Sequence, residues 1–416
     1  MIEIAGTKLL FDPWLVGPCW GGNIWHYPPP KITPEELTGI DFLYFSHAHD
    51  DHFHPQSLNR FNPEVKGAEV IIPAFETPYF ERIVHANGFN KIKVMKHDES
   101  FDLSPEVTVV MFVNDVGDHD SSLLVQADGK TIFFQTDNLM SIDEAKRIGE
   151  KYNIDIVFTI ASLTGLFPGF FDFPVETMTK LAKQKSKRAL NYSLDITMAL
   201  GAEYAIPYAC DLCYLGELYF ANDIHKADKR EFVKLAKEKK SNIKALLMGP
   251  GDQVEINEEK MECMFSEHDF SMENLGAYAS SKRKEIFEVE CQERCYAHTS
   301  YNDDIKSLRK LLDTAATEWT HESYRVLWKV IGDDGNAIIF SQTLPGRTEE
   351  CGLDWEYDLC IEIMSYRLQR LVRGDYKMGF VTLENGSIRC HRHVEEFVEL
   401  EKEFWKWALS KIHFKG

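Results

Sequence analysis

The stretch Ser46-His-Ala-His-Asp-Asp-His-Phe-His54 decides how this chain folds, and it follows directly on the largely apolar run Asp41–Phe45. Four of its residues occur in the order His-x-His-x-Asp-His within six positions: His47, His49, Asp51 and His52. Imidazole and carboxylate groups both suit zinc, iron and manganese as ligands. The spacing therefore predicts a site for a pair of transition-metal ions.

A buried strand directly before this stretch would place it in a loop at the edge of a sheet. In such a loop, His47 and His49 can face one metal ion while Asp51 and His52 turn toward a second. His54 lies outside the pattern, and we expect it to support the ligands from behind or to face solvent. A histidine-rich surface turn without metal is the alternative, but four ligand residues in this order after an apolar strand favour the metal site.

The same order resembles the signature of the metallo-β-lactamase superfamily. Ile2–Leu10 and the turn Phe11–Trp14 also resemble the opening of its lactonase-like and phosphodiesterase-like branches. The resemblance implies an α/β fold, an αββα sandwich with the metal ions at one edge of two facing sheets. It further implies a third histidine and then a bridging aspartate, each at a later strand end. His119 and Asp137 fill those places, Asp137 after the apolar run Thr131–Phe134.

The third ligand position is ambiguous. In the family the ligand commonly stands four residues before a serine that opens the next strand, and counting back from Ser122 gives Asp118 rather than His119. Either residue could ligate. A carboxylate at this position would make the site richer in oxygen, which favours iron over zinc.

The last ligand of the family is missing. It is usually a histidine two residues after a strand proline, but Ala209 stands at that distance from Pro207. Asp211, Cys210 and His225 are the candidates to replace it, and we prefer Asp211. The alternative is that none of the three binds metal.

This departure, together with Asp12–Gly22 and Trp25–Pro29, makes the chain most similar to the catalytic region of the CMP-N-acetylneuraminate hydroxylase family, over about residues 1–260. That family pairs such a region with an N-terminal Rieske cluster, whereas this sequence starts at the first expected strand. It contains no Cys-x-His followed by Cys-x-x-His that could ligate such a cluster. The resemblance therefore implies that electrons come from an external donor.

Composition narrows the class of protein. The 416 residues include 46 basic and 66 acidic side chains, a formal charge of −20, which argues against nucleic acid or an anionic membrane as the main partner. No signal peptide or membrane-length apolar run is found, so we expect a cytoplasmic protein. The nine scattered cysteines indicate reduced thiols rather than a disulfide framework.

The pattern of apolar runs predicts two domains. In residues 1–258, strand-like runs alternate with helical patterns, and Gly249–Asp252 breaks the pattern near the end of this domain. Residues 259–416 have an α+β order, with expected strands that include Met378–Val381, and faintly resemble a small lipid-carrier domain.

These observations predict a diiron oxygenase that hydroxylates or oxidises a small molecule with dioxygen. The carboxylate-rich segment Asp115–Asp120 and the aromatic residues around His26 resemble the diiron oxygenase branch, and His26 is the candidate catalytic residue beside the metals. Zinc and manganese are the alternative metals. A hydrolase of an ester, lactone or phosphodiester, working through a metal-bridging hydroxide, is the alternative function.

Overall fold

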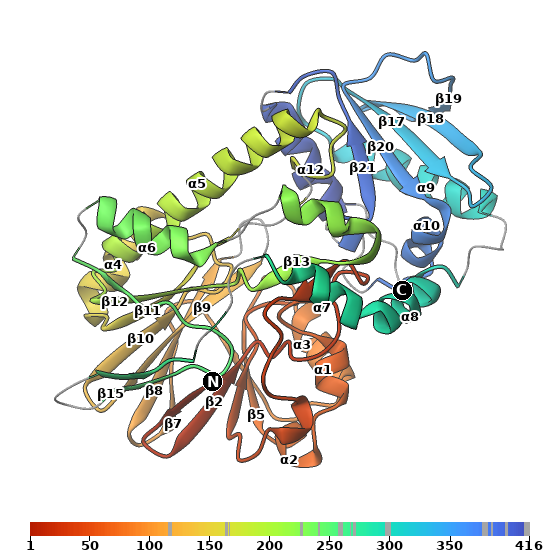
Figure 1. Ribbon diagram of the computed structural model, residues 1–416. Coiled ribbons are helices and arrows are strands. Elements are labelled where there is room, and N and C mark those ends of the chain that lie inside the picture. The colour runs from red at the N-terminus through yellow and green to blue at the C-terminus, as the bar shows by residue number, and fades with distance from the viewer. Residues whose placement is uncertain are drawn as a thin grey trace.

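The computed structural model describes residues 1–114, 119–162, 165, 167–224, 228–239, 242–256, 261–266, 268, 272–295, 301–376, 382–383, 386–395 and 398–411. In the first part of the chain two β-sheets face each other, and a third large sheet lies in the last part (Figure 1). The expected strand Met378–Val381 falls outside the described residues.

The first sheet has the order β1-β2-β4-β5-β6. β1 and β2 form an antiparallel hairpin, and β2, β4, β5 and β6 run parallel. Its strands are β1 (Ile2–Ile4), β2 (Thr7–Phe11), β4 (Phe42–Tyr44), β5 (Glu69–Pro73) and β6 (Ile92–Met95), and the helices that follow its strands are α1 (Pro55–Asn59), α2 (Pro63–Lys66) and α3 (Tyr79–Ala86).

The second sheet has the order β14-β12-β11-β10-β9-β8-β7. β7 to β10 form an antiparallel meander, whereas β10, β11, β12 and β14 run parallel. Its elements are β7 (Ser100–Ser104), β8 (Val107–Asn114), β9 (Asp120–Ala127), β10 (Lys130–Phe134), β11 (Ile156–Ile160), β12 (Tyr204–Tyr208) and β14 (Lys244–Ala245), with helices α4 (Ile142–Tyr152), α5 (Val175–Ala199) and α6 (Lys229–Glu238).

Alternation of buried side chains along the strands builds the layers. Leu9 of β2 and Phe134 of β10 lie in the core between the two sheets, whereas their neighbours Leu10 and Phe133 point to the opposite faces. Leu10 packs with the helices that cover the first sheet, and Phe133 packs with α4, α5 and α6. Two sheets with helices on both outer faces form the αββα sandwich, so the predicted fold is confirmed.

The strand ends that matter for function meet at one edge of this sandwich. β2 ends before Asp12, β4 ends before Ser46 and β10 ends before Asp137, while Asp120 begins β9, which is antiparallel to β10. Just below this edge the ring of Phe11 stacks on that of Phe134, with 3.9 Å between centroids. The two sheets are thus in contact where the predicted ligands emerge.

The last part of the chain forms a mixed sheet with the order β19-β18-β17-β20-β21. Its large core also takes in Trp20, Phe170 and Met178, so the two parts of the molecule share apolar contacts. The elements here are α9 (Asn302–Ala315), β17 (Tyr324–Ile331), β18 (Ala337–Leu344), β19 (Thr348–Glu350), β20 (Leu359–Met364), α10 (Ser365–Val372), β21 (Ile388–His391) and α12 (Glu399–Lys411).

Short elements join the two parts. β3 and β13 pair antiparallel, with His26 opposite Leu212, and β15 and β16 form a separate two-stranded sheet. Their bounds and those of the connecting helices are β3 (Ile24–His26), β13 (Leu212–Tyr214), β15 (Gln253–Ile256), β16 (Met261–Met264), α7 (Leu275–Ser281) and α8 (Arg283–Glu293). Among the described residues, no helix combines the length and the apolar character that crossing a bilayer requires.

The close packing of α4 against α5 can be tested at Gly149. A Cβ atom added there would lie 2.4 Å from the carbonyl oxygen of Leu200, which is backbone and cannot move aside. We expect Gly149→Ala to destabilise the protein by about 1–3 kcal/mol, because overpacking outweighs the better helix propensity of alanine. Thermal unfolding measures this.

Gly276 provides the matched control, because it is also helical but has only the Tyr219 hydroxyl, 3.8 Å away, near its added Cβ. Gly276→Ala should leave the midpoint unchanged or slightly higher. Equal midpoints for the two variants would show that α4 is not packed against Leu200 as described.

Candidate metal centre

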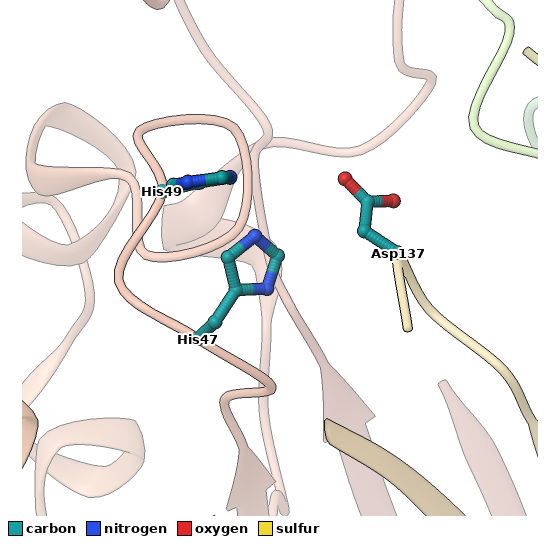
Figure 2. Close-up of side chains that lie close together, drawn as sticks. All are labelled: His47, His49 and Asp137. Atoms are coloured by element: carbon teal, nitrogen blue, oxygen red, sulfur yellow. The ribbon is translucent and has the colours of Figure 1, made fainter. Parts of the chain in front are cut away.

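Five of the predicted ligand residues converge at the sandwich edge. His47, His49 and Asp137 offer ligand atoms that all lie within 4.8 Å of one another, and so do Asp51, His52 and Asp137. Figure 2 shows His47 and His49 on the loop after β4, with Asp137 opposite them after β10. The two groups correspond to the two predicted metal positions, and Asp137 belongs to both, as expected for a bridging ligand. Ligation itself stays a prediction.

The loop that carries four of these residues is anchored on both sides. Phe45 before it and Phe53 within it are buried, and their rings meet edge to face at 4.8 Å. Between them the chain turns tightly, because the His49 carbonyl accepts hydrogen bonds from the backbone N–H groups of His52 and Phe53. The ligands are therefore placed by a loop that two aromatic side chains fix in the core.

The orientation of His47 suits metal binding. Its Nδ1 lies 2.8 Å from the hydroxyl of Ser46 and 3.1 Å from a carboxylate oxygen of Asp120. Its Nε2 is buried and has no hydrogen-bond partner among the described residues. Burial, reinforced by the neighbouring His52 and His49, holds the pKa of His47 well below its usual range. A neutral imidazole with a free Nε2 is the form that binds a metal ion.

His52 faces the centre in the same way. Its Nδ1 lies 2.9 Å from Asp12, while its Nε2 lies 3.3 Å from Asp137 and 3.9 Å from Asp51. Burial lowers the pKa of His52, but Asp137, Asp51 and Asp12 outweigh burial and raise that pKa well above its usual range. In the protein alone, His52 is thus the cation that these carboxylates attract.

Two carboxylates that support the ligands were missed as site residues by sequence reasoning. Asp12 accepts hydrogen bonds from the Ser46 N–H (2.8 Å) and hydroxyl (2.7 Å) as well as facing His52, and Asp120 faces His47. Asp12 had been considered only as part of a family-like turn, and Asp120 only as part of an acidic segment. Their positions could have indicated this role, because Asp12 directly follows a buried strand and Asp120 begins one.

The charge at the edge fits a pair of cations. Asp12, Asp51, Asp120 and Asp137 gather around the histidines, and each of these carboxylates lies within 4 Å of an imidazole nitrogen of His47 or His52. Asp51 Oδ1 is buried without a hydrogen-bond partner among the described residues, and burial raises the pKa of Asp51. Buried carboxylates are costly unless a cation compensates them. The residues present therefore fit divalent metal ions.

The third predicted ligand position is only partly described. His119 has a positive φ of 54°, and its ring lies 5.5 Å from that of Phe75 and 6.1 Å from that of Tyr79. His119 is not a member of either ligand group. Asp118, the alternative at this position, lies outside the described residues.

Asp211 is not a member of either ligand group, although we preferred it as the replacement ligand. Its carboxylate is 2.6 Å from the ammonium group of Lys229, which also donates to the Met248 carbonyl. Burial raises the pKa of Asp211, and Lys229 offsets part of that effect. Cys210 is buried in the core under α5 and α6, and His225 lies outside the described residues.

His26 and His54, the other two histidines considered from the sequence, make contacts within the fold. The ring of His26 lies 3.6 Å from that of Trp14, its Nε2 donates to the Trp14 carbonyl at 3.0 Å, and burial lowers its pKa to about 3. His26 is therefore neutral and a weak base, which does not favour a role in proton transfer. His54 is buried and caps α1 by accepting from the Ser57 N–H, so of its two expected positions the one facing solvent is wrong.

Comparison with known proteins gives partial similarities. No family model matches the chain. A protein of Mycolicibacterium smegmatis that carries the name of a Rieske 2Fe-2S iron-sulfur protein is 27% identical over 234 residues, covering 54% of this chain and 44% of the relative. The cytidine monophosphate-N-acetylneuraminic acid hydroxylase of Xenopus laevis is 22% identical over 217 residues, covering 50% and 36%. The chain thus spans less than half the length of the curated relatives that it matches.

Among solved structures, the CmlA β-hydroxylase is similar with a TM-score of 0.40 and 18% identity, covering 58% of this chain and 49% of that one. Other similar structures are metallo-β-lactamase fold proteins and metal-dependent hydrolases. The predicted resemblance to the hydroxylase family is confirmed by the sequence similarity over about half of the chain.

Loss of a ligand can be separated from loss of structure. Asp51→Ala should remove metal from one of the two groups and leave the fold, because the sheets are built by apolar strands elsewhere. His54→Ala should cost about 0.5–2 kcal/mol of stability through the lost helix cap and keep the metal content. Elemental analysis measures the metal content of both variants, and thermal unfolding measures their stability. Equal metal loss in the two variants would contradict the assignment of Asp51 as a ligand.

The supporting role of Asp12 gives a second test. Asp12→Asn keeps the size of the side chain but removes the charge that orients His52, so we expect metal affinity to fall by about 10- to 100-fold. Asp41→Asn is the control, because Asp41 accepts the Lys8 N–H at the other end of the strands. Competition with a chelator measures both affinities. Unchanged affinity in Asp12→Asn would show that Asp12 does not act on the ligands.

Proposed function

We propose that this protein is a dinuclear iron oxygenase that hydroxylates or oxidises a small molecule with dioxygen, using electrons from an external donor. The observation that carries the proposal is the pair of ligand groups joined by Asp137. Each group contains histidine and carboxylate and neither contains cysteine, a donor set that suits iron as well as zinc and manganese. The similarity to a hydroxylase over half of the chain supports oxygen chemistry.

The chain's own residues would hold the metals in a fixed arrangement. His47 and His49 would hold one ion and Asp51 and His52 the other, with Asp137 available to both. Two ferrous ions, when bound, supply electrons for the reduction of dioxygen. Asp12 and Asp120 hold the imidazoles of His52 and His47 in the orientation that leaves each Nε2 directed at the centre.

Aromatic side chains lie beside part of this centre. The indole of Trp20 meets the ring of His49 edge to face at 5.1 Å, and Trp20 itself is buried. Phe75 and Tyr79 lie against His119 near the same edge. Aromatic side chains at such a site would bind an organic substrate through its apolar surface.

A hydrolase is the alternative function, because the same ligands can hold two metal ions that activate a bridging water. The two functions differ in the metal that they need. An oxygenase requires a metal that changes oxidation state, whereas a hydrolase works with zinc. The decisive measurement therefore compares iron-loaded with zinc-loaded protein.

We expect anaerobic protein loaded with ferrous iron to bind about two ions per chain and to consume dioxygen on mixing, with a change in absorption as the iron is oxidised. The Asp51→Ala variant should bind less iron and consume less dioxygen. Hydrolysis of a nitrophenyl ester or phosphodiester by the zinc form, abolished in Asp51→Ala, together with an iron form inert to dioxygen, would overturn the oxygenase proposal in favour of the hydrolase.

A further inference from the structure

Thr136 stands directly before Asp137, the candidate ligand that both ligand groups share. Its backbone has a φ of 54°, in the left-handed region that favours glycine, and its side chain is buried. A β-branched residue is a genuine outlier in this region, and such a conformation persists only where the surrounding contacts hold it. The contacts of Thr136 therefore bear on the direction in which the chain presents Asp137.

The hydroxyl group of Thr136 supplies such a contact. Extended by two residues beyond the end of β10, the register of β9 with β10 would bring Thr136 opposite Ser121. At this position the Thr136 hydroxyl donates to the Ser121 carbonyl, and it also lies 2.7 Å from the carbonyl oxygen of Gln135. A side-chain hydrogen bond thus continues the contact between the two strands where β10 itself has ended.

Ser121 also holds the other ligand loop. Its hydroxyl donates to the Ser46 carbonyl at 2.7 Å and lies 2.8 Å from the hydroxyl of Tyr44, which ends β4 of the first sheet. Ser46 directly precedes His47. Because Ser121 is fully buried, these hydrogen bonds are stronger than they would be in water. One serine of the second sheet thus joins the loop of His47 to the segment of Asp137, which face each other in Figure 2.

The rest of the segment is fixed around Asp137. The Gln135 side chain is bonded at both of its polar atoms, because its amide donates to the Asn138 carbonyl at 3.2 Å and its oxygen accepts from the Thr159 hydroxyl at 2.8 Å. The side chains of Gln135, Asn138 and Thr159 are all buried. The turn that carries Asp137 is therefore closed by its own neighbours, and Thr136 provides its link toward the other ligand loop.

We propose that Thr136 is a positioning residue of the candidate metal centre. Its hydroxyl, bonded to the Ser121 carbonyl, holds the left-handed turn that presents the Asp137 carboxylate to both ligand groups. Because Ser121 also holds the carbonyl before His47, the same contact fixes the segment of Asp137 relative to the histidine loop. Partners that orient a ligand in this way commonly set the affinity for metal. The inference rests on the metal site of the proposed function and holds for either iron or zinc.

The test compares Thr136→Ser with Thr136→Val. Serine keeps the hydroxyl, whereas valine keeps the branched shape without it. We expect metal affinity to fall by about 10- to 100-fold in Thr136→Val and to stay at the wild-type value in Thr136→Ser, because only valine loses the bond to the Ser121 carbonyl. Competition with a chelator measures the zinc affinity, and the visible spectrum of the cobalt-loaded proteins reports a change in ligand geometry.

Thr197→Val is the matched control. Thr197 is also a buried threonine, but its hydroxyl donates to the Ser193 carbonyl at 2.8 Å within α5, on the outer face of the second sheet. This variant should keep the zinc affinity and the cobalt spectrum.

Thr136→Gly covers the case in which Thr136→Val does not fold. Glycine adopts a positive φ without strain but has no hydroxyl. We therefore expect Thr136→Gly to fold and still to bind zinc more weakly than Thr136→Ser does. Circular dichroism of the metal-free variants checks the fold.

The outcomes separate this inference from the metal centre itself. If Thr136→Ser binds zinc as weakly as Thr136→Val, the hydroxyl is not what positions Asp137 and the inference is overturned. Wild-type zinc affinity in folded Thr136→Val or Thr136→Gly would overturn it as well and leave the metal centre intact. Failure of wild-type protein to bind zinc or iron would overturn the metal centre and with it the role of Thr136.

Discussion

The hydrogen bonds of Asp12 are the constraint on which the rest of the centre depends. Its backbone N–H donates to the Tyr44 carbonyl, and its carboxylate accepts from the Ser46 N–H and hydroxyl and faces His52. One aspartate therefore ties the end of β2 to the end of β4 and orients a ligand at the same time. It also adds negative charge beside Asp51 and Asp137, so the arrangement that positions the imidazole increases the attraction for a cation.

That concentration of carboxylates links the charge of the centre to the stability of the fold. Buried carboxylates without a cation destabilise a protein, and burial raises the pKa of Asp51 accordingly. His52 compensates part of this charge in the polypeptide alone. A metal ion that binds the folded form compensates more of it and stabilises that form by mass action. Affinity for metal and tolerance of the buried charge thus have the same physical origin.

The sequence was sufficient for the parts of the centre that local order determines. His47, His49, Asp51 and His52 lie in one loop after a strand, and Asp137 follows another strand, so spacing and strand position predicted their meeting. The supporting partners depend on contacts between distant segments, which no local pattern contains. Asp211 depends on such a contact too, because its carboxylate pairs with Lys229, 18 positions later in the chain.

The last part of the chain is connected to the metal loop through the turn Cys19–Ile24. On one side of this turn, the Trp20 N–H donates to Asp50, next to the candidate ligand Asp51, and the indole meets the ring of His49. On the other side, Arg367 donates to the Gly21 carbonyl and Asn23 donates to Ser387 at 2.8 Å. Because the turn is held from both sides, the position of the Trp20 indole beside His49 depends on α10 and on the turn before β21. The last part of the chain therefore shapes the surroundings of a site to which none of its described residues contributes a candidate ligand.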